Sequence, residues 1–469
     1  MNGLNLFFVP GQNCPVRKKL RGPNLRIGKR ATNDKESEER TVASQKKHRD
    51  VVSVAQDRTT SIKKGLSKSA QKELRLLRLI HSNHNVSRLE LAKRTGGSAA
   101  AMTTIVQRLI GRGLVVESGK GSTNSGRKPV SLSLPHDLGY VVGVDLGSFF
   151  LRVIVTDIVG KIYHQFETET KMVEGREKVL SRTFGAVHKA IDKSQVPRAA
   201  IKGIGMAHSG VIDSHRGIVL CLPRPGQMTE WRNVPLRDML EKEFGVTSVL
   251  DDSARMMALA ERQFGLGQEI NDFLFIEVGM GIGASIFIDG KLYRGPGGSA
   301  GELGHMTVDE NGPLCSCGNN GCLEAMASCA ALIQEVRAGI QQGVNSKVSE
   351  FVNGDLSRVS IEIVVQAARE NDTLALRVLD EAVSHIGVVL ADVINLLNPS
   401  VVIFGGPLFR VAQELVLDRL RQVVRQRALE KSANEVRFKI SGLGSEAAAL
   451  GAARLASERI LEHLYAEKV

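Results

Sequence analysis

The chain contains no run of about 18 apolar residues, the shortest stretch that reads as a membrane-spanning helix, so no membrane span is predicted. A short apolar patch, Leu4 to Pro10, opens the sequence without basic residues before it, so we expect no secretory signal peptide. Cysteine is also scarce, with six residues in 469, and Cys14, Cys221 and Cys329 are scattered. That usage argues against a disulfide framework and favours a reducing, cytoplasmic location.

Positive charge is concentrated at the front of the chain. Residues 1–135 carry 27 Lys and Arg against 9 Asp and Glu, whereas the remaining 334 residues carry 35 against 41. A basic front on an acidic body indicates a polyanion as partner of the front alone, with a solubilising tail as the alternative. Residues 1–66 are basic, polar and nearly without periodicity, which predicts a mostly disordered arm. The arm adds phosphate contacts or reflects a start assigned too far upstream; both explanations stay open.

Four residues that bind metals lie within a short segment of the second half of the chain. They are His305, Cys315, Cys317 and Cys322. One imidazole and three thiolates are the ligands of a closed structural zinc site, and this spacing is hard to reconcile with ordinary loop cysteines. Gly318 and Gly321 let the loop turn back, so that the sulfurs on either side can face one ion. The sequence therefore predicts bound Zn²⁺.

The segments around these ligands resemble a known family. Glu-Leu-Gly-His at 302–305 and Cys-Ser-Cys-Gly-Asn-Asn-Gly-Cys-Leu-Glu at 315–324 are similar to a pattern of the ROK family (repressors, open reading frames, sugar kinases), and the likeness runs from about Ser69 onward. It implies an α/β body with two lobes, actin/hexokinase-like (ribonuclease-H-like), whose zinc loop shapes a sugar pocket. The expected segments are the arm at 1–66, a front domain at 67–135, a first lobe at 136–253 to which 444–469 returns, and a second lobe with the zinc loop at 254–443.

The front domain has the pattern of a winged helix-turn-helix. Apolar residues at helical spacing define a first helix, and Ser87 with Glu90 forms a capping box that begins a second. Ser98 is expected to cap a third helix that runs to about Arg112, and two strands joined by a basic loop follow. Three short helices and a basic hairpin are typical of this DNA-binding fold, which the family's repressors carry. The alternative is a three-helix packing module without DNA.

The third helix is expected to enter the major groove of double-stranded DNA. Residues expected to face the bases are Ser98, Ala99, Thr103, Thr104 and Gln107. Residues expected to meet phosphates or a minor-groove edge are Arg108, Lys120, Arg127 and Lys128. Because Ala99-Ala100-Ala101 offers few hydrogen-bonding side chains, readout is expected to depend on few residues or on the wing and DNA shape.

The body departs from the family's kinases at three segments. The turn after Gly147 continues with two phenylalanines where phosphate would approach, and a methionine replaces threonine in the second phosphate loop, at 277–284. In an ungapped alignment Ser253 takes the position of the kinases' general base, and a hydroxyl cannot accept the proton without a base of its own. A one-residue slip would give this role to Asp252. The departures favour a protein that is not an enzyme.

The resemblance also implies a sugar site. Residues that match sugar-binding positions of the family, or could add an acceptor, are Asp252, Glu302, His305 and Glu324. Alternatively, Glu302 and Glu324 only brace the zinc loop. The sequence predicts a sugar-responsive DNA-binding regulator, a repressor of carbohydrate-metabolism genes with a sugar or sugar-phosphate effector, working on its operator as a homodimer or homotetramer. The alternative function is an active, ATP-dependent hexose kinase with a fused DNA-binding domain.

Overall fold

The computed structural model describes residues 67–83, 86–120, 130–222 and 230–468. The expected arm at 1–66 lies outside this part of the chain, as do Arg127 and Lys128. The chain divides into two compact units, a front unit of residues 1–133 with 465–469 and a body of residues 134–464. This division differs from the predicted one at the end of the chain, because the residues from Tyr465 onward cluster with the front unit and not with the first lobe.

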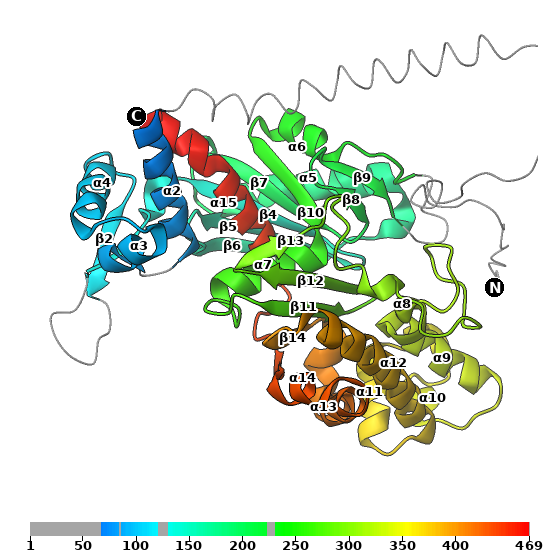
Figure 1. Cartoon of the computed structure of the whole chain (residues 1–469). Coiled ribbons are helices and arrows are strands. Elements are labelled where there is room, and N and C mark those ends of the chain that lie inside the picture. The colour runs from blue at the N-terminus through cyan, green and yellow to red at the C-terminus, as the bar shows by residue number, and fades with distance from the viewer. Residues whose placement is uncertain (1–66, 84–85, 121–129, 223–229, 469) are drawn as a thin grey trace, which may run out of the picture. The chain divides into compact units, whose positions relative to one another are not determined.

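The front unit contains the helices and strands that were predicted for it (Figure 1). Its helices are α2 (Lys68–Ser82), α3 (Arg88–Thr95) and α4 (Ala99–Gly111), and its antiparallel sheet has the order β1 (Val86–Ser87), β3 (Val130–Ser133), β2 (Val116–Lys120). The capping box of Ser87 and Glu90 is confirmed, and the Ser98 side chain caps α4 as predicted. Between the two helices Gly96 adopts φ +69°, a left-handed conformation that glycine takes without strain.

The body is built on two five-stranded sheets with the same topology. The first has the order β10 (Thr247–Asp252), β7 (Ile201–His208), β4 (Tyr140–Leu146), β5 (Phe150–Asp157), β6 (Ile162–Glu169). The second has the order β13 (Lys291–Tyr293), β12 (Ile282–Ile288), β11 (Phe273–Val278), β14 (Val401–Gly405), β15 (Arg437–Ile440). In each sheet the first three strands in sequence order form an antiparallel meander. The other two strands run parallel to the first strand of the meander, one directly beside it and the other beyond that one. This repeated arrangement confirms the predicted two-lobed, ribonuclease-H-like fold.

Helices cover the sheets and complete two apolar cores. The first core packs β4, β5 and β7 against α5 (Arg176–Lys193) and α6 (Leu236–Phe244). The second packs the other sheet against a helical layer that Figure 1 shows beside it. That layer consists of α8 (Leu323–Ala327), α9 (Cys329–Gln341), α10 (Lys347–Phe351), α11 (Ile361–Arg369), α12 (Thr373–Leu397), α13 (Pro407–Arg427) and α14 (Glu430–Glu435). The remaining elements are α7 (Ser253–Phe264), α15 (Ala447–Lys468), β8 (Val211–Asp213), β9 (Ile218–Cys221) and the short 3₁₀ turns η2 (His136–Leu138), η3 (Met172–Glu174), η4 (Arg198–Ala200), η5 (Leu303–His305) and η6 (Leu356–Arg358).

Helix α15 packs unusually closely against the first sheet. A Cβ atom placed on Gly143 of β4 would lie 1.9 Å from the carbonyl oxygen of Ala449, and one on Gly205 of β7 would lie 1.9 Å from that of Ala452. Glycine is needed at both positions, since backbone meets backbone there. Every helix in the described part of the chain is either too short or too polar to span a membrane.

Candidate functional site

The four predicted metal ligands converge in a loop of the second lobe. His305 ends the short turn η5, and the three cysteines lie on a loop that an isolated bridge between Thr307 and Cys322 closes. The loop passes Asp309 so tightly that a Cβ atom on Gly321 would lie 1.5 Å from the Asp309 carbonyl oxygen. Gly321 also has φ +59°, so a glycine is required for the return of the loop.

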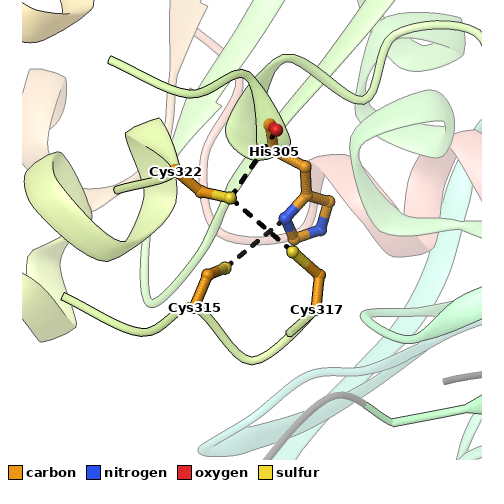
Figure 2. Close-up of side chains that lie close together, drawn as sticks. All are labelled: His305, Cys315, Cys317 and Cys322. Carbon is orange, nitrogen blue, oxygen red and sulfur yellow. Dashed lines mark hydrogen bonds between the residues drawn. The ribbon is translucent and has the colours of Figure 1, made fainter. Parts of the chain in front are cut away.

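The geometry of this cluster fits a tetrahedral metal site. All four ligand atoms lie within 4.8 Å of one another. The Sγ atoms of Cys317 and Cys322 are 3.6 Å apart, and the Cys315 Sγ lies 3.6 Å from Nδ1 of His305 (Figure 2). Ligands arranged tetrahedrally about 2.3 Å from an ion would be separated by about 3.8 Å. Burial raises the pKa of the Cys322 thiol, so a cation would be needed to favour its thiolate.

A buried ion-pair network lies beside the predicted sugar residue Glu302. Asp251 is fully buried at the end of β10, where Oδ1 accepts from Nη1 of Arg255 at 3.1 Å and Oδ2 from Nη2 of Arg294 at 2.7 Å. Nη2 of Arg255 also lies 3.8 Å from Oε1 of Glu302, whose side chain is 51% exposed. Glu302 is therefore an accessible carboxylate whose neighbour is held in place by Asp251.

Sequence reasoning missed this network. Arg255 aligns with the last residue of the kinases' Asn-Asp-Ala-Asn. This replacement of an amide by a guanidinium was the one feature of the sequence that could have indicated a new ion pair here. Arg294 gave no signal, because it is 43 residues from Asp251 in the chain.

Asp252 and Ser253 lie at the start of α7, where the family's kinases hold their base. Oδ1 of Asp252 caps the helix by accepting from the backbone N–H groups of Ala254 and Arg255, at 2.9 and 3.2 Å. Burial raises the pKa of Asp252 to about 7, although Arg255 opposes this shift. The Ser253 hydroxyl is buried and has no hydrogen-bond partner among the described residues. A neutral hydroxyl and a carboxyl that titrates near neutrality thus lie side by side.

Glu324 has a bracing contact of its own. Its Oε2 accepts from the backbone N–H of Ile282 at 3.0 Å, just after the second glycine-rich loop, and its Oε1 lies 3.5 Å from the Ser316 hydroxyl. Burial raises the pKa of Glu277, on the strand before that loop, to about 8, and the charges of Asp252, Asp145 and Glu324 act in the same direction. The contacts of Glu324 favour the bracing interpretation for one of its two oxygens.

The structure also describes the two segments in which the sequence departs from the phosphate loops of the family's kinases. Phe149 and Phe150 are exposed to solvent, and the guanidinium of Arg152 lies 5.1 Å from the centre of the Phe150 ring. Neither ring is packed into the core of the first lobe, so both large side chains lie at the surface of the turn. Met280 packs against the apolar core of the second lobe.

The predicted base-reading residues lie on the outer face of α4. Ser98, Ala99, Thr103, Thr104 and Gln107 are all exposed, while the inner face buries Met102, Ile105, Val106 and Leu109. The hydroxyls of Thr103 and Thr104 donate to the carbonyl oxygens of Ala99 and Ala100. Arg108 is exposed on the same helix, with its Nε donating to Glu73, and Lys120 is the last residue of β2.

Comparisons with known proteins extend this description. The model of the ROK family matches residues 141–459. The xylose repressor of Caldicellulosiruptor bescii is 33% identical over 379 residues, which cover 81% of this chain and 93% of that protein. The glucokinase of Thermotoga maritima is 32% identical over 320 residues, or 68% of this chain and 98% of the enzyme.

A solved structure shows the same relation. A ROK family transcriptional regulator, described as a homologue of the Escherichia coli MLC protein, superposes with a TM-score of 0.69 at 27% identity and covers 85% of this chain and 98% of its own. The family model spans more than half of the chain, and both relatives above exceed 30% identity over more than two thirds of it. The chain therefore belongs to the ROK family.

Proposed function

We propose that this protein is a sugar-responsive DNA-binding transcriptional regulator, a repressor of carbohydrate-metabolism genes that acts in the cytoplasm. The observation that carries the proposal is the length of the match to a xylose repressor. The match covers 81% of this chain, whereas residues 134–469 make up only about 72% of it, so the likeness includes part of residues 1–133, in the front unit. The exposed polar face of α4 gives this unit a surface for DNA.

The proposed DNA contacts divide into two kinds. The exposed residues of α4 would read base edges: Ser98, Ala99, Thr103, Thr104 and Gln107. The cations would meet the backbone: Arg108, Lys120, Arg127 and Lys128. One winged helix covers few base pairs, so we propose a homodimer or homotetramer that places two of them on one operator.

The proposed effector site lies between α7 and the zinc loop. Asp252 uses Oδ1 to cap α7, which leaves Oδ2 to accept from a hydroxyl, and Glu302 offers an accessible carboxylate. His305 faces the cysteines through Nδ1, so Nε2 remains for a hydroxyl. Among the described residues, Oε1 of Glu324 has a single hydrogen-bond partner, the Ser316 hydroxyl. Several acceptors in one site distinguish the stereochemistry of hydroxyls, which suits a sugar or a sugar phosphate.

The effector site can be tested through its influence on DNA binding. A thermal-shift screen with xylose, glucose, N-acetylglucosamine and their phosphates would identify a ligand, and repeated selection from random duplexes would provide an operator. Glu302→Ala should abolish the ligand's effect on operator affinity while leaving ligand-free affinity nearly intact, because only the interaction that differs between the two states is removed. Glu310→Ala, an exposed acid in the same segment, is the matched control. An unchanged ligand response in Glu302→Ala would place the effector elsewhere.

We further propose that the His305 and cysteine cluster holds one structural Zn²⁺ per chain. Cys317→Ser should lose the ion and destabilise the second lobe, because a structural site contributes folding free energy directly. Metal analysis and thermal unfolding would be compared with Cys221→Ser, which alters a buried thiol outside the cluster. A metal-free protein with unchanged stability would contradict the assignment.

Kinase activity is the competing function, and one observation favours it. A carboxyl with a pKa of about 7 at the start of α7 has the properties of a general base. We nevertheless propose that the protein is not an enzyme, because Ser253 takes the base position and the second phosphate loop carries Met280. An assay of ADP release over hexoses and pentoses decides this. Turnover at about 1–100 per second would establish the kinase.

A further inference from the structure

A buried carboxylate lies beside α4, the helix of the front unit that we propose enters the major groove. Glu73, on α2, is only 3% exposed. Its Oε1 accepts from Nε of Arg108 at 2.8 Å, and its Oε2 accepts from Nη1 of Arg112 at 2.5 Å. The same Oε2 accepts from the hydroxyl of Tyr465 at 2.7 Å, and this tyrosine is itself almost fully buried. Glu73 thus connects α2, the end of α4 and the last turn of α15.

The cluster carries an unbalanced positive charge. Burial alone would raise the pKa of Glu73, but the hydrogen bonds from Tyr465, Arg108 and Arg112 lower it below its ordinary value. Glu73 is therefore ionised at neutral pH, and one negative charge faces two guanidinium groups. The net charge of +1 lies at the exposed end of α4, where an anionic partner can approach.

The orientation of Arg108 leaves its outer edge available. Among the described residues, Arg108 donates to Glu73 through Nε alone. The two Nη groups are thus not used by this contact, and the side chain is 43% exposed. A guanidinium anchored at Nε presents a fixed pair of donors, which matches the geometry of a phosphate.

We propose that Glu73 and Tyr465 are positioning residues for DNA binding, which hold Arg108 so that its outer edge meets a backbone phosphate. This inference rests on the proposed function, since it requires that the front unit binds DNA. Tyr465 acts through Glu73 and touches no DNA. Its hydroxyl fixes the carboxylate that both arginines share, so its removal lets the carboxylate rotate and Arg108 lose its orientation.

Salt dependence separates this role from a merely structural one. Each phosphate contact contributes about 0.9 to the slope of log affinity against log salt concentration, because the contact releases counterions. A variant that is only less folded lowers affinity by the same factor at every salt concentration and leaves the slope unchanged. A variant that loses the Arg108 contact has a smaller slope.

The experiment measures binding of the full chain to a labelled random-sequence duplex of about 30 base pairs, between about 20 and 200 mM salt. Tyr465→Phe keeps the buried ring and removes the hydroxyl alone, and Tyr293→Phe, in the exposed part of β13, is the matched control. We expect Tyr465→Phe to weaken binding about threefold to tenfold at low salt and to reduce the slope by up to about 0.9, with unchanged thermal unfolding of the body. Tyr293→Phe should match the wild type.

A double variant completes the test. Arg108→Ala should reduce the slope by about 0.9, and adding Tyr465→Phe to it should change neither affinity nor slope further, because both changes remove one contact. A normal slope in Tyr465→Phe, or additive losses in the double variant, would overturn the inference while wild-type binding still supports the proposed function. Absence of duplex binding by the wild type would overturn both.

Discussion

Two buried carboxylates, one in each unit of the molecule, are each shared by two arginines, yet their surroundings differ. Asp251 in the body pairs with Arg255 and Arg294, whose side chains are 5% and 29% exposed. Glu73 in the front unit pairs with Arg108 and Arg112, which are 43% and 32% exposed. Arg255 also has a second acidic neighbour, since its Nη2 lies 3.8 Å from Oε1 of Glu302. In the body the shared carboxylate belongs to a network with a second acid and one buried arginine, which we call the closed network. In the front unit both arginines remain accessible to a partner, and we call this the open network.

The largest expected effect comes from removing the charge of the closed network. Asp251→Asn replaces the carboxylate nearest to the buried guanidinium of Arg255 by a neutral amide, so we expect a loss of about 3–5 kcal/mol in the free energy of unfolding of the body. Urea unfolding with metal present measures this loss. Asp418→Asn, which disrupts an exposed pair with Arg421, is the control and should cost less than about 1 kcal/mol. Equal losses in the two variants would remove the distinction between closed and open pairs.

Changing the pH should affect the two units in opposite directions. Burial raises the pKa of Asp145 to about 6, that of Asp252 to about 7 and that of Glu277 to about 8, so the folded body binds more protons than the unfolded chain. This contribution to stability is complete below the ordinary carboxyl pKa and is lost as the pH rises through about 6 to 8. We expect a loss of about 2–4 kcal/mol between about pH 5.5 and 8.5.

The front unit has the reverse sign. The pKa of Glu73 is lowered by its hydrogen bonds, so its contribution is present above the ordinary glutamate pKa and is lost only as the pH falls below that value. Urea unfolding at several pH values measures the body, and hydrogen exchange in α2 and α4 measures the front unit. Glu277→Gln should flatten the profile of the body; an unaltered profile would show that this carboxyl does not titrate as expected.

The smallest effect should follow from neutralising the open network. Glu73→Gln removes the charge that balances Arg108 and Arg112, but both arginines reach solvent, so we expect a loss of only about 1–3 kcal/mol in the stability of the front unit. Hydrogen exchange of the α4 amides reports it, with Glu117→Gln, in an exposed pair with Arg88, as control. A loss as large as that of Asp251→Asn would show that exposure is not what separates the networks.

Local patterns were predictable from the sequence. The capping box of Ser87 and Glu90 depends on two residues three positions apart, and the structure confirms it. The clustering of His305 with the three cysteines was also predictable, because cysteine and histidine have few roles at this spacing and the loop that gathers them is short. The repeated sheet topology followed from the resemblance to the ROK family, and it would not have followed from periodicity alone.

Contacts between distant parts of the chain were not predictable. Asp251 and Arg294 are separated by 43 positions, and Glu73 and Tyr465 by 392, so no pattern of charge or spacing connects them. Arg108 was predicted to meet phosphate because it is a cation on the third helix, but its hydrogen bond to Glu73 on α2 could not be predicted from the sequence. The exposure of Phe149 and Phe150 was likewise not predictable, because it depends on how the strands on either side of the turn are placed.

The contact between Glu73 and Tyr465 has a consequence for biosynthesis. A ribosome that adds about 5–20 residues per second needs roughly 20–80 seconds to pass from one residue to the other. During most of this interval Glu73, Arg108 and Arg112 are already part of the chain, but the hydroxyl that completes their buried cluster does not yet exist. A chain that ends before Tyr465 would therefore lack one of the contacts that hold Arg108, and the surface proposed to meet DNA would be incompletely fixed until that residue is added.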